Sequence, residues 1–436
     1  MKLVHTIVPG LIVAMCTSGA VRAGDVIEVS PVGNPNLTHV HPVLGDSCTE
    51  DVYNVQNALL AVEPGGTVIL KAGRFEFGEQ LIQINPDKPG VTLAGEGMHR
   101  TVIGGGGSGY YYNFYFTVLV MANGVKVRDL TFDGPTGVTM CIVPYNISEE
   151  NWEPIEDFES VRVRIINPHP SPVGGFRAGW HPIATTGKVV IRNCTFEVSE
   201  PTANFDHAVN ALWFRVGTAD VEITDNFFKF NYTPVDPYMN MAIQVGTPPS
   251  SDAIVSAKIR RNKVVGGVGL YVHNLRGKVD ICFNHISAKH TGIWISTSSP
   301  DGSESFVVRR NYIYMSDGPD TSAAMRCGGT WTSPLASDMI VRANMMRGRA
   351  GYGVYVSAGS NNLFIGNNLV GLDTPITYYF GEDTSGNRVI GYTGGCDSVV
   401  DLGTDNFIAG CTRRAAKQAA PPVGTSTWGR IKSSFK

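Results

Sequence analysis

The hexapeptide Ile281-Cys282-Phe283-Asn284-His285-Ile286 has the form apolar-x-x-Asn-x-apolar, and the same form recurs along the chain. The other copies are Ile223 to Phe228, Ile259 to Val264, Val308 to Ile313, Val341 to Met346 and Phe364 to Leu369. Their Asn residues are Asn226, Asn262, Asn284, Asn311, Asn344 and Asn367, spaced by 36, 22, 27, 33 and 23 positions, with Cys194 and Leu130 at the equivalent place upstream. Such spacing is typical of a repeat protein whose loops vary in length.

A second pattern follows each copy of the first and alternates apolar residues with mixed ones, as a strand does. Its members are Leu212 to Arg215, Ile243 to Gly246, Leu270 to His273, Ile293 to Ser296, Met325 to Gly328, Val354 to Ser357 and Ile376 to Tyr379. No helical periodicity lies between the two patterns. Two strands per repeat predict an all-β solenoid of parallel strands, in which each coil buries its apolar face against the next.

The recurring Asn supports this stacking. An Asn between two apolar neighbours would be buried, where an unpaired amide costs about 1–3 kcal/mol. If the coils stack in register, each Asn can bond the Asn above and below it, so the sequence predicts a buried asparagine ladder. The alternative is that each Asn merely marks a turn on the surface.

The N-terminal part carries the most specific motifs. Thr49-Glu50-Asp51-Val52 begins a predicted amphipathic helix that presents Val52, Val55, Leu59 and Leu60 on one face. Pro64 to Phe75 reads PGGTVILKAGRF, and Val91 to Gly97 reads VTLAGEG. These segments resemble the opening coils of the pectin-lyase-like superfamily of right-handed parallel β-helices. The resemblance implies a right-handed parallel β-helix with an N-terminal capping helix. It does not imply one activity, because that superfamily includes lyases, hydrolases, epimerases, tailspikes and non-catalytic proteins.

The ends of the chain differ from the repeats. Residues 1–23, with Lys2, an apolar run and Val21-Arg22-Ala23, are predicted to be a signal peptide cleaved before Gly24, which indicates a secreted or periplasmic protein. Residues 24–411 are predicted to form a single β-helix domain, and residues 412–436 a basic linker and tail. No other stretch approaches the roughly 18 apolar residues of a membrane span.

Composition narrows the partners. The chain is 43% hydrophobic and 17% charged, with a formal net charge of −3, and it has no basic stripe within RNA-binding motifs, so nucleic acid is not expected. Seven Cys remain after residue 23, which argues against a disulfide framework. We expect Cys194 and Cys327 to be packed thiols, whereas Cys396 and Cys411 are placed to pair across a terminal loop. None has the spacing of a zinc site.

The mixed places of the second pattern predict a binding strip. Strands stack about 4.8 Å apart, so equivalent side chains form columns. One column holds Trp213, Gln244, Tyr271, Trp294, Arg326, Tyr355 and Thr377, and its neighbour holds Arg215, Gly246, His273, Ser296, Gly328, Ser357 and Tyr379. Exposed aromatic rings beside Gln and Arg suit a polysaccharide, so Trp213, Gln244, Tyr271, Trp294 and Tyr355 are the predicted binding residues. The alternative is that long loops cover the strip and its aromatic residues are core.

Two sets of residues suit catalysis on such a strip. Asp206-His207 and Asp236 lie in long loops beside it and supply carboxylates for glycoside hydrolysis. Arg215, His273 or Arg326 would instead serve as base or charge stabiliser in β-elimination, with carboxylates holding Ca²⁺. An acidic segment from Glu149 to Glu159 is compatible with calcium, but it lacks the EF-hand alternation, and a solvated loop is favoured.

A further column holds Arg128, Arg192, Arg260, Arg309 and Arg342 on the first strands, suited either to an acidic polymer or to pairing with neighbouring acids. The chain lacks the Asn-Thr-Asp and Gly-His-Gly motifs of polygalacturonases and the Asp-Pro-His motif of alginate epimerases, which belong to the superfamily that it resembles. The sequence thus predicts a secreted polysaccharide-binding β-helix protein, either a lyase or hydrolase acting on acidic glycans or a non-catalytic surface adhesin or scaffold.

Overall fold

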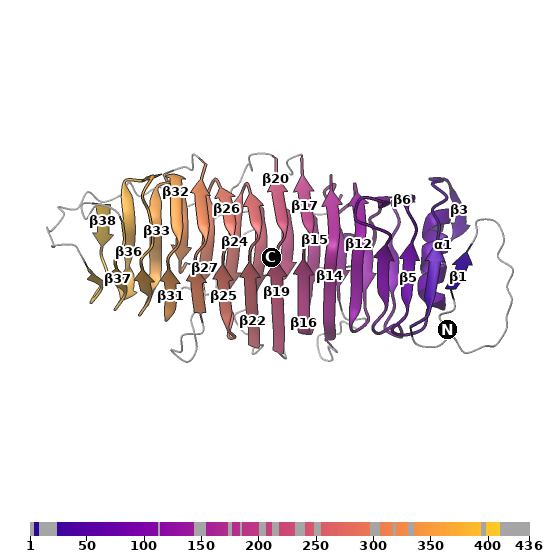
Figure 1. Ribbon diagram of the computed structural model, residues 1–436, viewed down its shortest axis with the longest axis horizontal. Helices are drawn as coiled ribbons and strands as arrows, with labels where there is room; N and C mark the ends of the chain where they lie inside the picture. Colours follow the sequence, from indigo (N-terminus) through magenta and orange to yellow (C-terminus); the bar gives the residue numbers. More distant parts are fainter. Residues whose placement is uncertain are drawn as a thin grey trace.

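The computed structural model describes residues 4–7, 24–111, 114–143, 154–172, 177–183, 185–199, 206–211, 218–231, 240–247, 254–296, 306–316, 320–329, 335–393 and 398–409. These residues form an elongated right-handed parallel β-helix, whose strands lie across the long axis and whose one helix lies at the N-terminal end (Figure 1). The predicted fold is therefore confirmed. Successive coils pair mostly in parallel, with local register shifts, over three faces, which we call the first, second and third face.

The first two faces form one continuous sheet that bends at the asparagine corner. The first face contains β1 (Val4–Ile7), β2 (Val26–Val29), β5 (Thr67–Leu70), β8 (Thr92–Gly95), β12 (Val125–Asp133), β14 (Ile155–Ile166), β16 (Thr185–Arg192), β19 (Thr218–Thr224), β22 (Ile254–Arg260), β25 (Val279–Cys282), β28 (Phe306–Arg309), β31 (Met339–Arg342), β34 (Leu363–Ile365), β37 (Arg388–Ile390) and β39 (Phe407–Ile408). The second face contains β6 (Gly73–Gly78), β9 (Thr101–Gly105), β17 (Thr195–Val198), β20 (Phe227–Phe230), β23 (Lys263–Val265), β26 (His285–Ala288), β29 (Tyr312–Met315), β32 (Met345–Arg349) and β35 (Leu372–Asp373). β12 and β14 continue through the corner onto the second face, since their C-terminal halves pair with β9 and β17.

The third face is a separate sheet. It contains β7 (Ile82–Ile84), β10 (Ser108–Tyr111), β11 (Phe114–Val120), β13 (Val138–Ile142), β15 (Arg177–Pro182), β18 (Asp206–Ala211), β21 (Asn240–Gly246), β24 (Val268–His273), β27 (Thr291–Ser296), β30 (Ala323–Cys327), β33 (Tyr352–Ser360), β36 (Ile376–Ser385) and β38 (Val399–Asp401). A small antiparallel hairpin, β3 (Leu37–Val40) and β4 (Ser47–Thr49), precedes the helix. One apolar core runs between the faces from Ile27 to Val389.

The helix α1 (Glu50–Ala61) forms where the sequence predicts it. Thr49 caps it, because its hydroxyl accepts the backbone N–H of Val52 at 3.2 Å. Val52, Val55 and Leu59 are fully buried against the first coils, while Leu60 is half-buried. The helix thus covers the apolar end of the solenoid that an unpaired first coil would expose.

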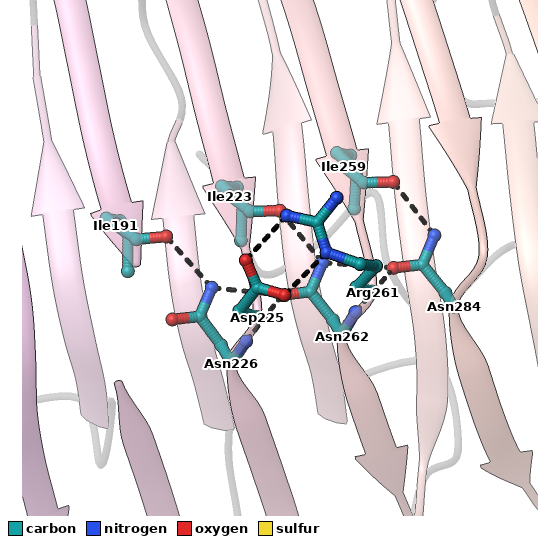
Figure 2. Close-up of polar contacts among 8 residues, drawn as sticks. All are labelled: Ile191, Ile223, Asp225, Asn226, Ile259, Arg261, Asn262 and Asn284. Carbon is teal, nitrogen blue, oxygen red and sulfur yellow. Dashed lines mark hydrogen bonds and ion pairs between the residues drawn. The ribbon is translucent and has the colours of Figure 1, made fainter. Parts of the chain in front are cut away.

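The predicted asparagine ladder is confirmed. Each ladder side chain is buried and donates its amide to a carbonyl one coil back. Between the two ends of the ladder, each also donates to the next Asn and accepts from the previous one (Figure 2). Asn284, for example, donates Nδ2–H to Ile259 O at 2.8 Å and to Asn311 Oδ1 at 2.9 Å, while its own Oδ1 accepts from the backbone and side chain of Asn262 at 3.0 Å. The ladder runs from Asn226 to Asn367, and Cys194 N–H closes its upstream end on Asn226 Oδ1.

A left-handed backbone residue precedes every ladder position. Asp225, Arg261, Phe283, Arg310 and Ala343 have φ between 52° and 60°, a conformation that non-glycine residues rarely adopt. Their side chains point outward at the corner, as Asp225 and Arg261 do in Figure 2. The chain tolerates this conformation because the following Asn fixes the backbone on both sides.

A second, shorter ladder that the sequence patterns did not reveal lies at the corner between the third and first faces. It consists of Asn362, Asn387 and Asn406, joined at 2.9 Å from each Nδ2 to the next Oδ1. It begins at Met339 N–H, which donates to Asn362 Oδ1 at 3.1 Å. The C-terminal coils are therefore tied at two corners.

The predictions for the chain ends and the cysteines have different outcomes. β1 lies inside the predicted signal peptide and pairs in parallel with β2, while residues 412–436, Cys396 and Cys411 lie outside the described residues. Cys194 and Cys327 are buried free thiols, as predicted. In the described part of the chain, no helix is long and apolar enough to cross a membrane.

Candidate functional site

The predicted column of side chains exists on the third face. Parallel register places Gln244, Tyr271, Trp294, Arg326 and Tyr355 side by side on consecutive strands. The two ends differ from the prediction. Asn210, rather than Trp213, precedes Gln244, and Tyr379, rather than Thr377, follows Tyr355. We call these seven residues, from Asn210 to Tyr379, the strip.

A recurring small residue in the third-face strands marks the observed register. In each strand, a small or short residue lies two positions before the strip residue, and the residue between them is apolar and buried. The triplets are Gly179-Trp180-His181, Ala208-Val209-Asn210, Ala242-Ile243-Gln244, Gly269-Leu270-Tyr271, Gly292-Ile293-Trp294, Ala324-Met325-Arg326, Gly353-Val354-Tyr355 and Thr377-Tyr378-Tyr379. A larger side chain does not fit at this small position, because a Cβ on Gly292 would lie 2.5 Å from Ala324 O. This pattern predicts the register of the strip from the sequence. It also places His181 at the position equivalent to the strip residues, one strand before Asn210.

The strip is held together by stacked rings and one cation. The Tyr271 and Trp294 ring centroids lie 4.7 Å apart. The Arg326 guanidinium lies 5.3 Å from the Trp294 ring and 5.1 Å from the Tyr355 ring. Tyr355 and Tyr379 stack at 4.9 Å with 5° between their planes. From Tyr271 to Tyr379 the strip is therefore a continuous series of cation–π and ring contacts.

Exposure divides the strip. Tyr271 and Trp294 are only 4% and 3% exposed, so the prediction of open aromatic faces is wrong for both. They pack with Met241 and Val268 in a small apolar cluster of their own, and Trp294 Nε1–H donates to Gly328 O at 3.2 Å. In contrast, three tyrosines in the C-terminal coils are half-buried: Tyr352, Tyr355 and Tyr379, which we call the tyrosine platform.

Arg326 lies beside the platform and is 9% exposed. Its Nη2 donates to Thr321 O at 3.2 Å. Within the described residues, its Nε–H has no acceptor and no carboxylate forms an ion pair with it. A buried guanidinium without a counter-charge is costly unless a ligand provides one.

Three histidines lie next to the N-terminal half of the strip. His181 and His207 interact electrostatically, His207 hydrogen-bonds Gln244, and the Gln244 amide donates to His273 Nε2 at 3.4 Å. Burial lowers the pKa of His181 to about 4, that of His207 to about 3 with repulsion from His181, and that of His273 to about 4. All three imidazoles are therefore neutral at neutral pH. His181 donates from Nδ1 to Asn210 O at 2.8 Å, so Nε2 is its basic nitrogen.

Asp206 has a different environment from the predicted one. It lies in β18, not in a loop, and it is fully buried. Arg177 donates to both carboxylate oxygens, from Nε at 2.7 Å and from Nη2 at 2.9 Å, and its Nη1 donates to Pro168 O at 2.8 Å. This bidentate geometry is that of a structural ion pair rather than of an acid or base beside an open strip. His207, in the same strand, remains beside the strip.

Other predicted site residues lie elsewhere. Trp213, Arg215 and Asp236 lie outside the described residues. Part of the acidic segment, Glu156 to Glu159, belongs to strand β14 and not to a loop. Among the described residues, no three His, Cys, Asp or Glu side chains gather as a metal site.

The predicted arginine column is present but interrupted. Arg192, Arg260 and Arg309 pair with Glu159, Asp280 and Asp280 respectively. Val161, Thr224 and Cys282 occupy the intervening coils. A hollow of about 160 Å³ on the first face is lined by Lys126, Val127, Arg128, Glu159, Val161, Arg162 and Arg192. It is on a different face from the strip.

No protein-family model matches the chain, and no curated protein is similar enough to count as a relative. Among solved structures, DFA-IIIase from Arthrobacter chlorophenolicus A6 without its lid, in complex with GF2, is 13% identical, with a TM-score of 0.51, over 90% of this chain and 99% of that one. The A-module of a mannuronan C-5 epimerase from Azotobacter vinelandii is 16% identical over 81% and 98%, with a TM-score of 0.44. A tailspike protein of bacteriophage CBA120 is 11% identical over 85% and 61%, with a TM-score of 0.47.

At these identities the likeness concerns the fold. The class is that of the right-handed parallel β-helices, as the resemblance to the pectin-lyase-like superfamily implied. No individual catalytic family is identified.

Proposed function

We propose that this protein is exported and binds an acidic polysaccharide along its third face, with Arg326 and the tyrosine platform holding one carboxylated sugar. The observation that carries the proposal is the environment of Arg326. Its guanidinium is nine-tenths buried, and no carboxylate of the described residues pairs with it. A uronate carboxylate bound to the Arg326 guanidinium would provide the missing counter-charge.

The tyrosine platform supports the same ligand class. Tyr355 and Tyr379 are stacked and half-buried, so part of the platform remains open to solvent beside the cation. Sugar rings pack their C–H faces on such aromatic rings, and the phenol hydroxyls can exchange hydrogen bonds with sugar hydroxyls.

Cleavage of the bound polysaccharide by β-elimination is the more specific hypothesis. In β-elimination, a neutral imidazole such as that of His207 or His273 would take the proton α to the uronate carboxylate. The electron pair left on that carbon would form a double bond in the ring as the β carbon–oxygen bond to the next sugar breaks, and the departing oxygen would take a proton from solvent. The predicted alternative is a non-catalytic adhesin or scaffold that binds the same polymer.

The test is to incubate the protein with pectate, alginate and chondroitin, with and without EDTA, while measuring binding, new reducing ends and unsaturated product. We expect binding to at least one acidic polymer and none to neutral dextran. Ultraviolet-absorbing product would assign a lyase, and binding without product would assign the non-catalytic alternative. Absence of binding to every acidic polymer would contradict the proposal.

A variant pair locates the site. Tyr355→Ala removes the middle of the platform and should weaken binding at least about tenfold, which corresponds to about 1.4 kcal/mol. Phe407→Ala is the matched control, because Phe407 is also an exposed ring under an arginine, with Arg388 at 5.9 Å, but lies on the first face. Equal binding by the two variants would place the ligand away from the platform.

A further inference from the structure

The outer surfaces of the first and second faces change in charge halfway along the solenoid. In the four coils β22–β23, β25–β26, β28–β29 and β31–β32, the strands and the corner between them carry nine basic residues and one acid, Asp280. The basic residues are Lys258, Arg260, Arg261, Lys263, Arg309, Arg310, Arg342, Arg347 and Arg349. The whole chain has a net charge of −3, so this surface is a local exception.

The four preceding coils, β12, β14, β16–β17 and β19–β20, have the opposite balance on the same two faces. They carry nine acids and seven basic residues. Ion pairs connect them from coil to coil, among them Arg162 with Asp129 at 2.8 Å, Lys229 with Glu197 at 3.2 Å and Lys188 with Glu222 at 3.6 Å. The upstream coils form the same two faces with paired charges, so the stability of these faces does not require an excess of cations.

Aromatic rings are interleaved with the basic side chains at the ladder corner. Lys263 lies 5.3 Å from the Phe227 ring, and Arg310 lies 5.6 Å from the Phe283 ring, which is 46% exposed. His285 and Tyr312 meet edge to face at 4.6 Å. Lys258, Lys263, Arg310, Arg342 and Arg347, which we call the basic corner, are all exposed.

We propose that the basic corner is a second binding surface, which takes a stretch of acidic polysaccharide lying along the solenoid axis. The cations lie on three of these four coils, β22–β23, β28–β29 and β31–β32, with coils stacked about 4.8 Å apart, so they present a row of positive charge to a linear array of carboxylates. The surface lies on the first and second faces, whereas the tyrosine platform lies on the third. The two sites are therefore separate, and each proposal can fail without the other.

The rings favour a polysaccharide over a single-stranded nucleic acid. Nucleic-acid platforms need open aromatic faces on which successive bases stack. Here Lys263 lies over the Phe227 ring, His285 and Tyr312 contact each other edge to face, and Phe283 is a single exposed ring beside Arg310 rather than part of a row. The basic corner is thus equipped for charge and hydroxyl contacts rather than for base stacking.

The test uses the full-length protein, labelled alginate oligomers and two triple variants. The first carries Lys258→Glu, Arg310→Glu and Arg347→Glu, and the control carries Lys126→Glu, Arg128→Glu and Lys188→Glu, which are equally exposed on the upstream coils. Both are made in a Tyr355→Ala background, so that the platform does not mask the second site.

At an ionic strength of about 0.05 M, the basic-corner variant should lose at least about tenfold in affinity and most of the salt dependence of binding, while the control stays within about threefold. Melting temperatures of both should match the background, because all six positions are exposed. Equal affinities in the two variants would overturn the proposal. Displacement of alginate by single-stranded DNA at equal or lower concentration would overturn the choice of polysaccharide.

Discussion

The ladder corner and the third face use buried polar groups in opposite ways. At the corner, one residue type repeats from Asn226 to Asn367. Successive Asn side chains are joined at 2.9–3.0 Å, and each amide also donates to a backbone carbonyl one coil back at 2.8–3.1 Å. On the third face, unlike side chains meet: a histidine cluster, a Gln, buried aromatic rings and an arginine. The Arg326 Nε–H has no acceptor there among the described residues.

This difference separates stability from function. A ladder of identical residues satisfies itself and contributes mainly to the fold. A face of unlike residues with an unpaired cation contributes less to stability than its burial suggests, and such sites are retained where they bind something. The following experiments test this separation.

The largest effect is expected from Asn284→Ala. The substitution removes four hydrogen bonds and leaves Ile259 O and the donors of Asn262 unsatisfied in the core. We expect a loss on the order of 5 kcal/mol in unfolding free energy, measured by denaturant titration. Asn368→Ala, one residue beyond the ladder and half-buried, is the control and should cost about 1 kcal/mol. Similar losses at the two positions would show that the ladder has no special role.

Trp294→Ala should be nearly as damaging. Because Trp294 is 3% exposed and packs with Tyr271, its truncation should cost about 4 kcal/mol. Tyr355 lies beyond Arg326 on the strip and is half-buried, so Tyr355→Ala should reduce the unfolding free energy clearly less while weakening polysaccharide binding. If Trp294→Ala instead leaves the melting temperature unchanged and lowers only affinity, the strip is open along its whole length.

Asp206→Asn addresses the buried ion pair. It leaves Arg177 without its counter-charge, and breaking such a pair costs about 3 kcal/mol. The double variant Arg177→Met/Asp206→Leu should recover most of the loss, because both charges are then removed. A double variant as unstable as Asp206→Asn would contradict the ion-pair explanation. Loss of glycan cleavage in Asp206→Asn at unchanged stability would restore Asp206 as a catalytic candidate.

The smallest effect is a pH dependence from the histidine cluster. His207 has its pKa lowered to about 3 in the folded protein, chiefly by burial, from an ordinary value of 6.5. The unfolded chain therefore binds more protons below pH 6.5, so the stability from neutral His207 is complete above pH 6.5 and falls as the pH drops toward 3. In His207→Gln, the slope of unfolding free energy against pH between 6 and 4 should decrease by about 1.4 kcal/mol per pH unit. An unchanged slope would show that His207 is not buried in the neutral form.

The repeat pattern predicts the corner well because its chemistry is local and periodic. An Asn flanked by apolar residues at fixed offsets admits few other structures, and the cap motif from Thr49 onward follows helix-capping rules. The second ladder was missed because Asn362, Asn387 and Asn406 span only the last coils, and few copies make a weak pattern.

The third face was harder to predict. The run Ala208 to Phe214 is apolar at both parities, so alternation alone selected a register three residues away from the observed one, and an odd shift turns the opposite side chains outward. Burial of Trp294 and the pairing of Asp206 with Arg177 depend on contacts between residues far apart in the chain. Hydrophobic pattern does not contain that information. The small residue two positions before each strip residue is the local signal that indicates the register.

The most direct test of the account is a titration of Arg326→Gln with alginate oligomers, combined with its melting curve. We predict that affinity falls at least about tenfold while the melting temperature is unchanged or higher, because a buried cation without a carboxylate partner is removed. Wild-type affinity in this variant would contradict the claim that the third face holds an acidic sugar at Arg326.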